Sequence, residues 1–211
     1  MSDPVDDSGW ATPPLRFDSD KPVEPDLLAR ILGAATLAPS PYNLQPWRFV
    51  VVRDAANRRR LQACAWNQPM VGQAPVVVIV LGYLAPDQTH LDAMLDRRLE
   101  LGACTPGRAA EIRGRAVAAV GRAPDRALWA TRSAMLAAAS LMRAAGATGV
   151  SSALLDEFDA DALSETFGVP DDHAICCLIA LGWTHQSEPF PGRFGLDEVC
   201  YAEHFGQPWT G

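Results

Sequence analysis

The chain has 211 residues, of which 48% are hydrophobic, and it carries a formal net charge of -7 with a pI near 5.0. This length and apolar content are sufficient for one large domain with a sizeable core. The acidic balance argues against a nucleic-acid-binding surface, because phosphate contacts need clustered Lys and Arg. The one basic run, Arg58 to Arg60, is interpreted as the solvated side of a helix.

The cysteines and the N-terminal segment bear on the cellular compartment. Five cysteines occur without a C-x-x-C pair, which disfavours a zinc site and a disulfide framework and indicates reduced thiols in a cytoplasm. Residues 1–14 are polar, acidic and proline-rich, so we expect a flexible arm and no secretory signal. The most apolar helical run, 134–142, is too short to span a bilayer. We therefore expect a cytoplasmic protein with no membrane or nucleic-acid partner, and a single domain over 15–211.

The first half of the chain alternates between helical periodicity and apolar runs. Helices are expected over 24–38 and 54–65, the first ending because Pro39 disfavours helical geometry in the residue before it. Strands are expected over 49–52 and 75–82, which are almost entirely apolar and β-branched. Such strands are typical of a sheet covered on both faces, so these runs predict an α/β or α+β fold.

The second half adds helices, one more strand and a tail. Helices are expected over 87–101, 125–145 and 159–167, a loop and strand over 149–155, and a buried strand over 174–183. The segment up to Gly121 is interpreted as helical without assigned chemistry. Between 133 and 142 the long helix is apolar nearly all round, which predicts burial on every side at a subunit interface. The tail, 189–211, is expected to form an edge strand at 199–201 and to cross to a partner chain.

A polar loop punctuated by prolines, 38–49, separates the first helix from the first strand. Its prolines lock φ and remove backbone donors, so the remaining polar groups of Ser40, Asn43 and Gln45 are held in fixed directions. Loops of this kind commonly hold a ligand. The alternative is a rigid turn that only joins helix to strand, and Asn67 in the break at 66–69 carries the same two interpretations.

Several separated segments together resemble the flavin-dependent nitroreductase family. The strongest match is the loop, Ala38-Pro39-Ser40 followed by Asn43 and Gln45-Pro46-Trp47-Arg48-Phe49. Further matches follow in the same order along the chain: Arg16-Phe17 before Asp20 to Val23, Asn67 before Ala74 to Val77, Gly149 to Phe158, Leu181 to Trp183, and Gly192 to Phe194 with Asp197 to Val199.

The resemblance implies an α+β fold with a central, mostly antiparallel or mixed sheet flanked by helices. It implies an intertwined homodimer that binds FMN at the subunit interface. NADH or NADPH would then serve as reductant for a ping-pong hydride transfer to a nitroaromatic, quinone or similar acceptor. The cofactor carries out this chemistry, so no catalytic side chain is implied. The implied cofactor-binding residues are Arg16, Pro39, Ser40, Pro41, Asn43, Asn67, Leu154, Leu155, Asp156, Glu157 and Arg193.

The N-terminal motif departs from the family pattern. The family carries several basic residues ahead of the phenylalanine, whereas Ala11 to Phe17 contains only Arg16. Likewise, Pro191 stands where a second cation sometimes lies, and Glu157 where a glycine is common. These departures favour an alternative function, in which a degenerate FMN site belongs to a flavin-sequestering or non-turnover ligand-binding protein.

Overall fold

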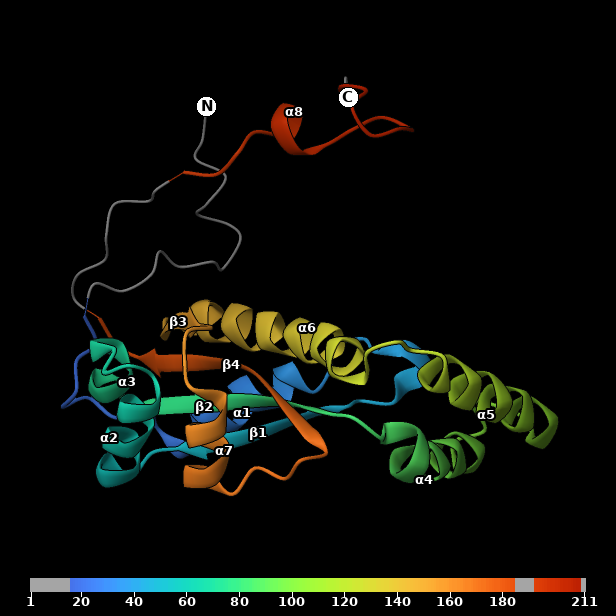
Figure 1. The fold of residues 1–211 in the computed structure, drawn as a ribbon, viewed down its shortest axis with the longest axis horizontal. Coiled ribbons are helices and arrows are strands. Elements are labelled where there is room, and N and C mark those ends of the chain that lie inside the picture. Colours follow the sequence, from blue (N-terminus) through green and yellow to red (C-terminus); the bar gives the residue numbers. More distant parts are fainter. Residues whose placement is uncertain (1–15, 185–191, 210–211) are drawn as a thin grey trace.

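A four-stranded antiparallel sheet forms the centre of the computed structural model, which describes residues 16–184 and 192–209 (Figure 1). The strand order is β1 (Trp47–Val52), β2 (Val76–Tyr83), β4 (His173–Gly182) and β3 (Ser151–Leu155), and all three pairings are antiparallel. The expected α+β class is therefore confirmed. The expected N-terminal arm, 1–14, lies outside the described residues.

Strand β2 sits in the middle of the core, and its side chains alternate between two apolar clusters. Val76, Val78 and Val80 pack against α1 (Pro25–Ala35) and α6 (Arg126–Ala147). Val77 and Ile79 face the opposite side, which is covered by α2 (Ala55–Cys64), α3 (Pro69–Gln73) and α7 (Ala160–Phe167). Because both faces are covered, every residue of β2 is buried, as its apolar run predicts.

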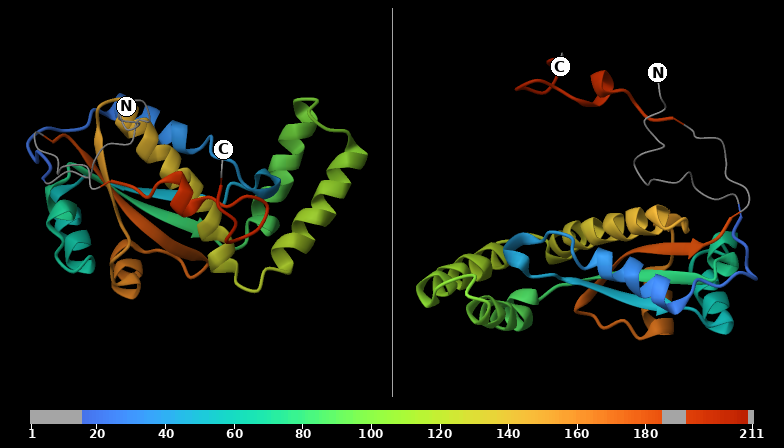
Figure 2. Two further views of the ribbon diagram at one scale, coloured as in Figure 1. Left: turned by 90° about the horizontal axis from the view of Figure 1, so that it is seen from above. Right: turned by 180° about the vertical axis from the view of Figure 1, so that it is seen from behind.

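Helices α4 (Pro86–Glu100) and α5 (Pro106–Gly121) form a pair that projects beyond one end of the sheet (Figures 1 and 2). They enclose a third apolar cluster, and Leu44 from the proline-rich loop is fully buried in it. Pro106 opens α5, and the Thr105 hydroxyl accepts a hydrogen bond from the Arg108 backbone N–H. This cap satisfies one of the free donors at a helix start.

Several helix and strand boundaries and one exposure pattern were predicted wrongly from the sequence. Helix α1 ends at Ala35 rather than 38, β1 begins at Trp47 rather than 49, and β4 ends at Gly182 rather than 183. The loop and strand expected over 149–155 are confirmed by β3. Strand β1 was expected to be covered on both faces, but it lies at the sheet edge with Arg48 and Val51 exposed. An edge strand of mainly apolar residues therefore remains open to another chain.

The expected strand at 199–201 was also wrong. The structure instead has a short helix, α8 (Leu196–Val199), followed by an isolated bridge between Tyr201 and Pro208. Strand geometry at an edge requires a neighbouring strand, and this tail stands away from the body of its own chain (Figures 1 and 2). In the described part of the chain, the tail therefore pairs with no strand beyond this single bridge.

Helix α6 was expected to be buried on every side at a subunit interface, and within one chain it is covered only on the side that faces the sheet. A single chain does not test whether a partner covers its outer side. Ala134, Ala137 and Ala138 are fully buried against the sheet, whereas Leu128 and Leu136 are 49% and 48% exposed. Within 16–184 and 192–209, no helix has the length and apolar character needed to cross a membrane.

Candidate functional site

The proline-rich loop is held by its own hydrogen bonds. The Ser40 hydroxyl oxygen accepts from the Gln45 backbone N–H at 2.9 Å, and the Ser40 carbonyl accepts from the Asn43 N–H at 2.9 Å. Pro41 to Asn43 thereby close into a 3-10 turn. Ser40 thus serves the turn, as one interpretation of the sequence holds, although its O–H remains a donor for a ligand.

The same loop holds an unusual density of left-handed backbone. Tyr42, Asn43 and Gln45 have φ of 55°, 59° and 46°. Each such residue costs on the order of 1 to 3 kcal/mol, and strain of this kind concentrates at ligand sites. Burial of Leu44 in the cluster between α4 and α5 offsets part of this cost. The carboxamide of Asn43 makes no hydrogen bond to the described residues and lies in an exposed position.

A second strained turn occurs at Trp66 and Asn67, where φ is 48° and 59°. The Asn67 N–H donates to the Gln62 carbonyl at 2.9 Å, which fixes the backbone, while its carboxamide is exposed and has no partner in the part of the chain that is described. Next to it, the Gln68 amide donates to the Glu157 carbonyl at 2.8 Å. The structure therefore brings Asn67 together with the expected segment 154–157.

Within 154–157, the side chains have different environments. Leu155 is 7% exposed and packs beneath the sheet, so only its backbone can face a ligand. Leu154 is 39% exposed, and Asp156 and Glu157 are exposed. These three side chains, unlike that of Leu155, are open to a bound molecule.

The two strained turns lie at opposite ends of the sheet. The proline-rich loop enters β1 at Trp47, which pairs with Gly82, whereas Asn67 precedes α3 and the start of β2 at Val76. Strand β2 spans about 23 Å between its ends at roughly 3.3 Å per residue. One chain therefore cannot place Asn43 and Asn67 on the same small molecule.

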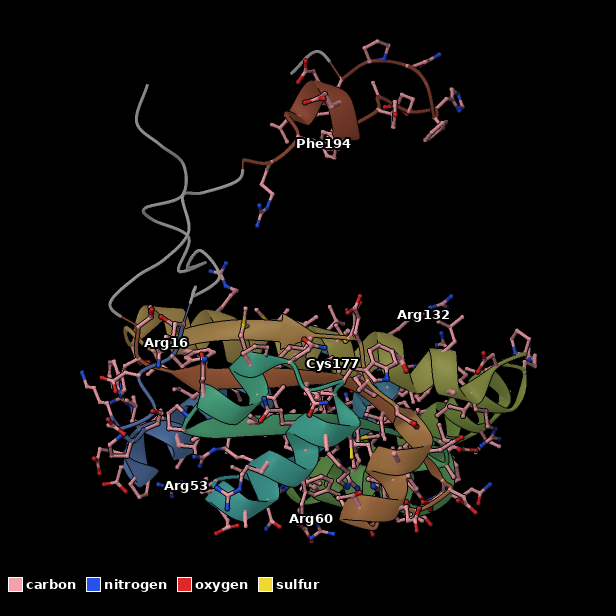
Figure 3. All side chains as sticks on the ribbon, turned by 60° about the vertical axis from the view of Figure 1, so that its left-hand side comes forward. Arg16, Arg53, Arg60, Arg132, Cys177 and Phe194 are labelled. Carbon is pink, nitrogen blue, oxygen red and sulfur yellow. The ribbon has the colours of Figure 1, made fainter. Side chains whose placement is uncertain are left out.

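The two arginines expected at a phosphate are also far apart in one chain. Arg16 lies on the body beside the end of β4, where its carbonyl accepts from the Thr184 hydroxyl at 2.8 Å. Arg193 belongs to the tail next to Phe194, which Figure 3 shows standing off from the body that carries Arg16. The guanidinium of Arg193 donates to the Gly192 carbonyl at 2.7 Å.

Known proteins resemble this chain along most of its length. The family model described as "Nitroreductase family" matches residues 16–183. The chain belongs to the nitroreductase family. It is 36% identical over 185 residues to an NADH dehydrogenase of Thermus thermophilus, covering 87% of this chain and 88% of that protein. It is 25% identical over 189 residues to the major NAD(P)H-flavin oxidoreductase of Aliivibrio fischeri, covering 83% and 84% of the two chains.

The fold of this nitroreductase also matches solved structures. A nitroreductase-like protein from Streptococcus mutans superposes with a TM-score of 0.85 at 25% identity, covering 93% of this chain and 96% of that one. The family match includes the strained loop and the sheet that positions it, since both lie within residues 16–183.

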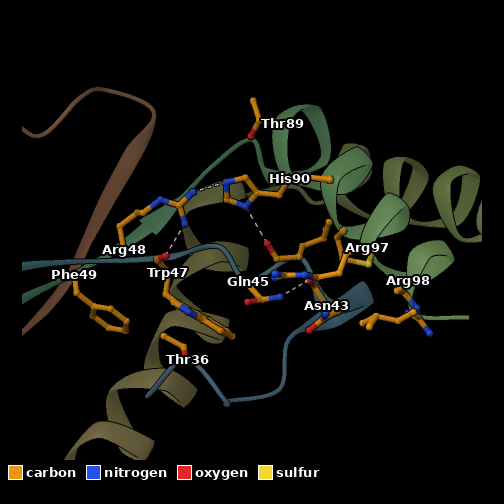
Figure 4. Close-up of a pocket in the computed structure, with 14 residues that line it drawn as sticks. Thr36, Asn43, Gln45, Trp47, Arg48, Phe49, Thr89, His90, Arg97 and Arg98 are labelled. Atoms are coloured by element: carbon orange, nitrogen blue, oxygen red, sulfur yellow. Dashed lines mark hydrogen bonds between the residues drawn. The ribbon is translucent and has the colours of Figure 1, made fainter. Parts of the chain in front are cut away.

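One feature of this nitroreductase could not be predicted from its sequence. A cleft of about 680 Å³ lies between the proline-rich loop, the start of β1 and the outer side of α4 (Figure 4). Three guanidinium groups line it, and we call it the arginine cleft after them: Arg48, Arg97 and Arg98. The pair at 97–98 was visible in the sequence, but nothing there indicated that Arg48 faces it across a cleft.

His90, on α4, links the two walls of the arginine cleft through hydrogen bonds to Leu44 and Arg48. Its Nδ1 donates to the Leu44 carbonyl at 3.0 Å, which leaves Nε2 to accept a hydrogen bond from Arg48. Burial lowers the pKa of His90 from its ordinary value of 6.5, and the positive charge of Arg48 lowers this pKa further, against the opposing effect of the Leu44 hydrogen bond. His90 is therefore a neutral, structural imidazole near pH 7.

Proposed function

We propose that this nitroreductase binds FMN and transfers hydride from NADH or NADPH to a nitroaromatic, quinone or related acceptor. The observation that carries the proposal is the pair of strained turns. Each presents an asparagine carboxamide, Asn43 or Asn67, that has no hydrogen-bond partner among the described residues. Membership of the nitroreductase family and the names of the relatives, which include an NAD(P)H-flavin oxidoreductase, support it.

The residues on each turn fit a flavin. Asn67 supplies a carboxamide donor and acceptor suited to the pyrimidine edge of the ring, and the neighbouring exposed 156–157 segment lies beside it. From the other turn, Ser40 contributes a hydroxyl donor and Asn43 a carboxamide. Arg16 and Arg193 are the cations suited to the phosphate, because a guanidinium binds phosphate oxygens bidentately.

These residues bind and orient, and the cofactor carries the redox chemistry. Bound at these residues, FMN would supply the hydride chemistry between the nicotinamide and the acceptor. The Asn67 carboxamide, carried on a backbone that the Gln62 carbonyl holds, would donate to the pyrimidine edge and stabilise the negative charge of the reduced ring there. The protein therefore needs no acid, base or nucleophile at the reacting atoms.

We further propose that the active protein is a homodimer whose tail crosses to the partner. Two apolar surfaces of the single chain support this assembly. One is the outer side of α6, with Leu128 and Leu136 about half exposed. The other is the tail, where large side chains are 41% to 90% exposed: Phe194, Leu196, Val199, Tyr201, Phe205 and Trp209. Exposed apolar surface of this extent is typical of an interface, and a two-fold dimer places Asn43 of one chain beside Asn67 of the other.

The proposal is tested by the colour and redox behaviour of the purified protein. We expect a yellow protein whose flavin absorbance bleaches on addition of NADH or NADPH under nitrogen, with FMN identified by mass after gentle denaturation. A colourless protein that takes up no added FMN would contradict the proposal. A protein that holds FMN but is reduced by neither nicotinamide would support the sequestering alternative.

A further inference from the structure

The arginine cleft concentrates positive charge on two facing walls. Its lining contains Arg48, Arg97, Arg98 and His90 but no Asp or Glu. Among the described residues, none of the three arginines forms an ion pair with a carboxylate. The helix dipole favours cations in the last turn of α4, which accounts for the pair at 97–98. It does not account for Arg48, which comes from β1 on the opposite wall.

Arg48 is held in place before any anion binds. One of its Nη atoms donates to the Trp47 carbonyl at 2.8 Å, and the other donates to Nε2 of His90. His90 is itself fixed through Nδ1 to the Leu44 carbonyl. A guanidinium carries five N–H donors, so Arg48 keeps donors for a ligand beyond these two bonds. Because the side chain is already oriented, binding an anion costs less conformational entropy.

The size of the cleft and its floor limit what the anion can be. The volume of about 680 Å³ lies in the range of sites for nucleotide-sized or drug-sized ligands, and inorganic phosphate or a single nitrobenzene ring would fill little of it. Trp47, Phe49 and Met94 give the cleft an apolar floor, which suits a planar ring. The chemistry of the cleft therefore fits a phosphorylated nucleotide.

The positions of the arginines favour a ligand with two separate anionic groups. Arg97 and Arg98 lie on the side of the cleft where Asn43 is found, whereas Arg48 lies with His90 on the other side (Figure 4). Each guanidinium can bind phosphate oxygens bidentately. One phosphate at Arg97 and Arg98 would leave Arg48 for a second.

The cleft also adjoins the proposed flavin site, because Asn43 lines both. A reductant whose nicotinamide lies on the flavin can therefore extend its other half into the cleft. In NADPH the nicotinamide is followed by the diphosphate and then by an adenosine that carries a 2′-phosphate. NADH differs only in lacking this 2′-phosphate.

We propose that the arginine cleft binds the adenosine half of NADPH, with the diphosphate at Arg97 and Arg98 and the 2′-phosphate at Arg48. The inference rests on the proposed oxidoreductase function and deepens it, because it selects NADPH over NADH. The diphosphate takes the side of the cleft that Asn43 borders, which is the side nearer the nicotinamide. The adenine covers the apolar floor.

Binding of nucleotides without a nicotinamide tests the cleft apart from any redox step. Adenosine 2′,5′-bisphosphate and 5′-AMP, which lacks the 2′-phosphate, are titrated calorimetrically into the full-length protein. The variants are Arg48→Gln and the double change Arg97→Gln/Arg98→Gln. The matched control is Arg59→Gln/Arg115→Gln, which removes two exposed arginines outside the cleft.

We expect the wild type to bind the bisphosphate at least about tenfold more tightly than AMP, because charge-assisted hydrogen bonds to the 2′-phosphate are strong. Arg48→Gln should abolish most of this preference. Arg97→Gln/Arg98→Gln should weaken both nucleotides about tenfold or more, and the control should match the wild type. Equal affinity of the wild type for the two nucleotides, or an unaltered preference in Arg48→Gln, would overturn the inference.

Bleaching of bound FMN under nitrogen isolates the step that uses the reductant. The wild type should be reduced more efficiently by NADPH than by NADH, and Arg48→Gln should lower this ratio about tenfold. The acceptor step is measured separately with 4-nitrobenzoate and uncharged nitrobenzene. If the cleft variants left the NADPH to NADH ratio unchanged and raised the KM for nitrobenzoate alone, the anion would belong to the acceptor and the inference would be overturned.

The FMN content of the same samples separates this inference from the proposed function. A wild type that takes up no FMN would overturn the proposed function, and the nucleotide titration would still show whether the cleft binds a 2′-phosphate. A loss of FMN from the cleft variants with unaltered nucleotide binding would place the phosphate of FMN in the cleft. That result would overturn the assignment of the cleft to NADPH and leave the redox function standing.

Discussion

Replacing Asn67 with glycine separates its two interpretations, as a turn residue and as a flavin ligand. At φ 59°, glycine adopts the backbone without strain, so Asn67→Gly keeps the turn and removes only the carboxamide. Two hydrogen bonds to a flavin edge, each contributing about 0.5 to 1.5 kcal/mol, amount to about 1 to 3 kcal/mol. We therefore expect the FMN dissociation constant to rise about 5- to 150-fold, with the free energy of unfolding of the apoprotein within about 1 kcal/mol of wild type.

The assay for Asn67→Gly is titration of apoprotein with FMN, followed by quenching of flavin fluorescence, together with urea unfolding of the apoprotein. Asn57→Ala is the matched control, because it removes an exposed carboxamide from the nearby helix α2. If Asn67→Gly bound FMN as tightly as the control and the wild type, Asn67 would be a turn residue only, and the assignment of this turn to the cofactor would be refuted.

Three further predictions concern stability. Leu44→Ala empties a fully buried position between the loop and helices α4 and α5, and should lower the free energy of unfolding by about 2 to 5 kcal/mol in urea. The folded-state pKa of His90 lies below its unfolded value of 6.5. The contribution of His90 to stability is therefore present above pH 6.5 and is lost as the pH falls below it. His90→Gln should remove this contribution from the dependence of the unfolding free energy on pH, measured between pH 5 and 7.5. Gly182→Ala would place a Cβ 2.6 Å from Pro75 Cδ and 2.9 Å from Phe17 Cδ1, so thermal unfolding should report a loss of about 1 to 3 kcal/mol, and an unchanged melting temperature would contradict this packing.

The core strands and the loop could be predicted from the sequence because their signals are local. The run 75–82 is apolar at every residue, and a strand with that composition is stable only where both faces are covered. The same reasoning failed for β1, since the apolar run 49–52 does not show that its strand lies at an edge. Edge position is a property of the whole sheet, and composition alone does not encode it.

The arrangement of the site could be predicted less well than the core strands, because it depends on contacts between residues that are far apart in the sequence. The sequence identified Asn43 and Asn67 as candidates, but only the strand register shows that they lie at opposite ends of β2. The arginine cleft was missed for the same reason, because Arg48 and Arg97 are separated by 49 positions in the sequence and meet only when α4 packs beside the loop. The tail was misassigned at 199–201 because strand pairing there requires a neighbour that one chain does not provide.

Subunit mixing tests most directly the central claim that two chains build one flavin site. Asn43→Gly and Asn67→Gly are prepared separately, each defective at both sites of its homodimer, and are then exchanged at equal concentration. In the mixed dimer, one site receives both changes and the other receives neither, so about one quarter of all sites should regain wild-type FMN affinity. Recovery of no tight sites after demonstrated exchange would contradict the account, because it would place both asparagines at a site within one chain or at no common site.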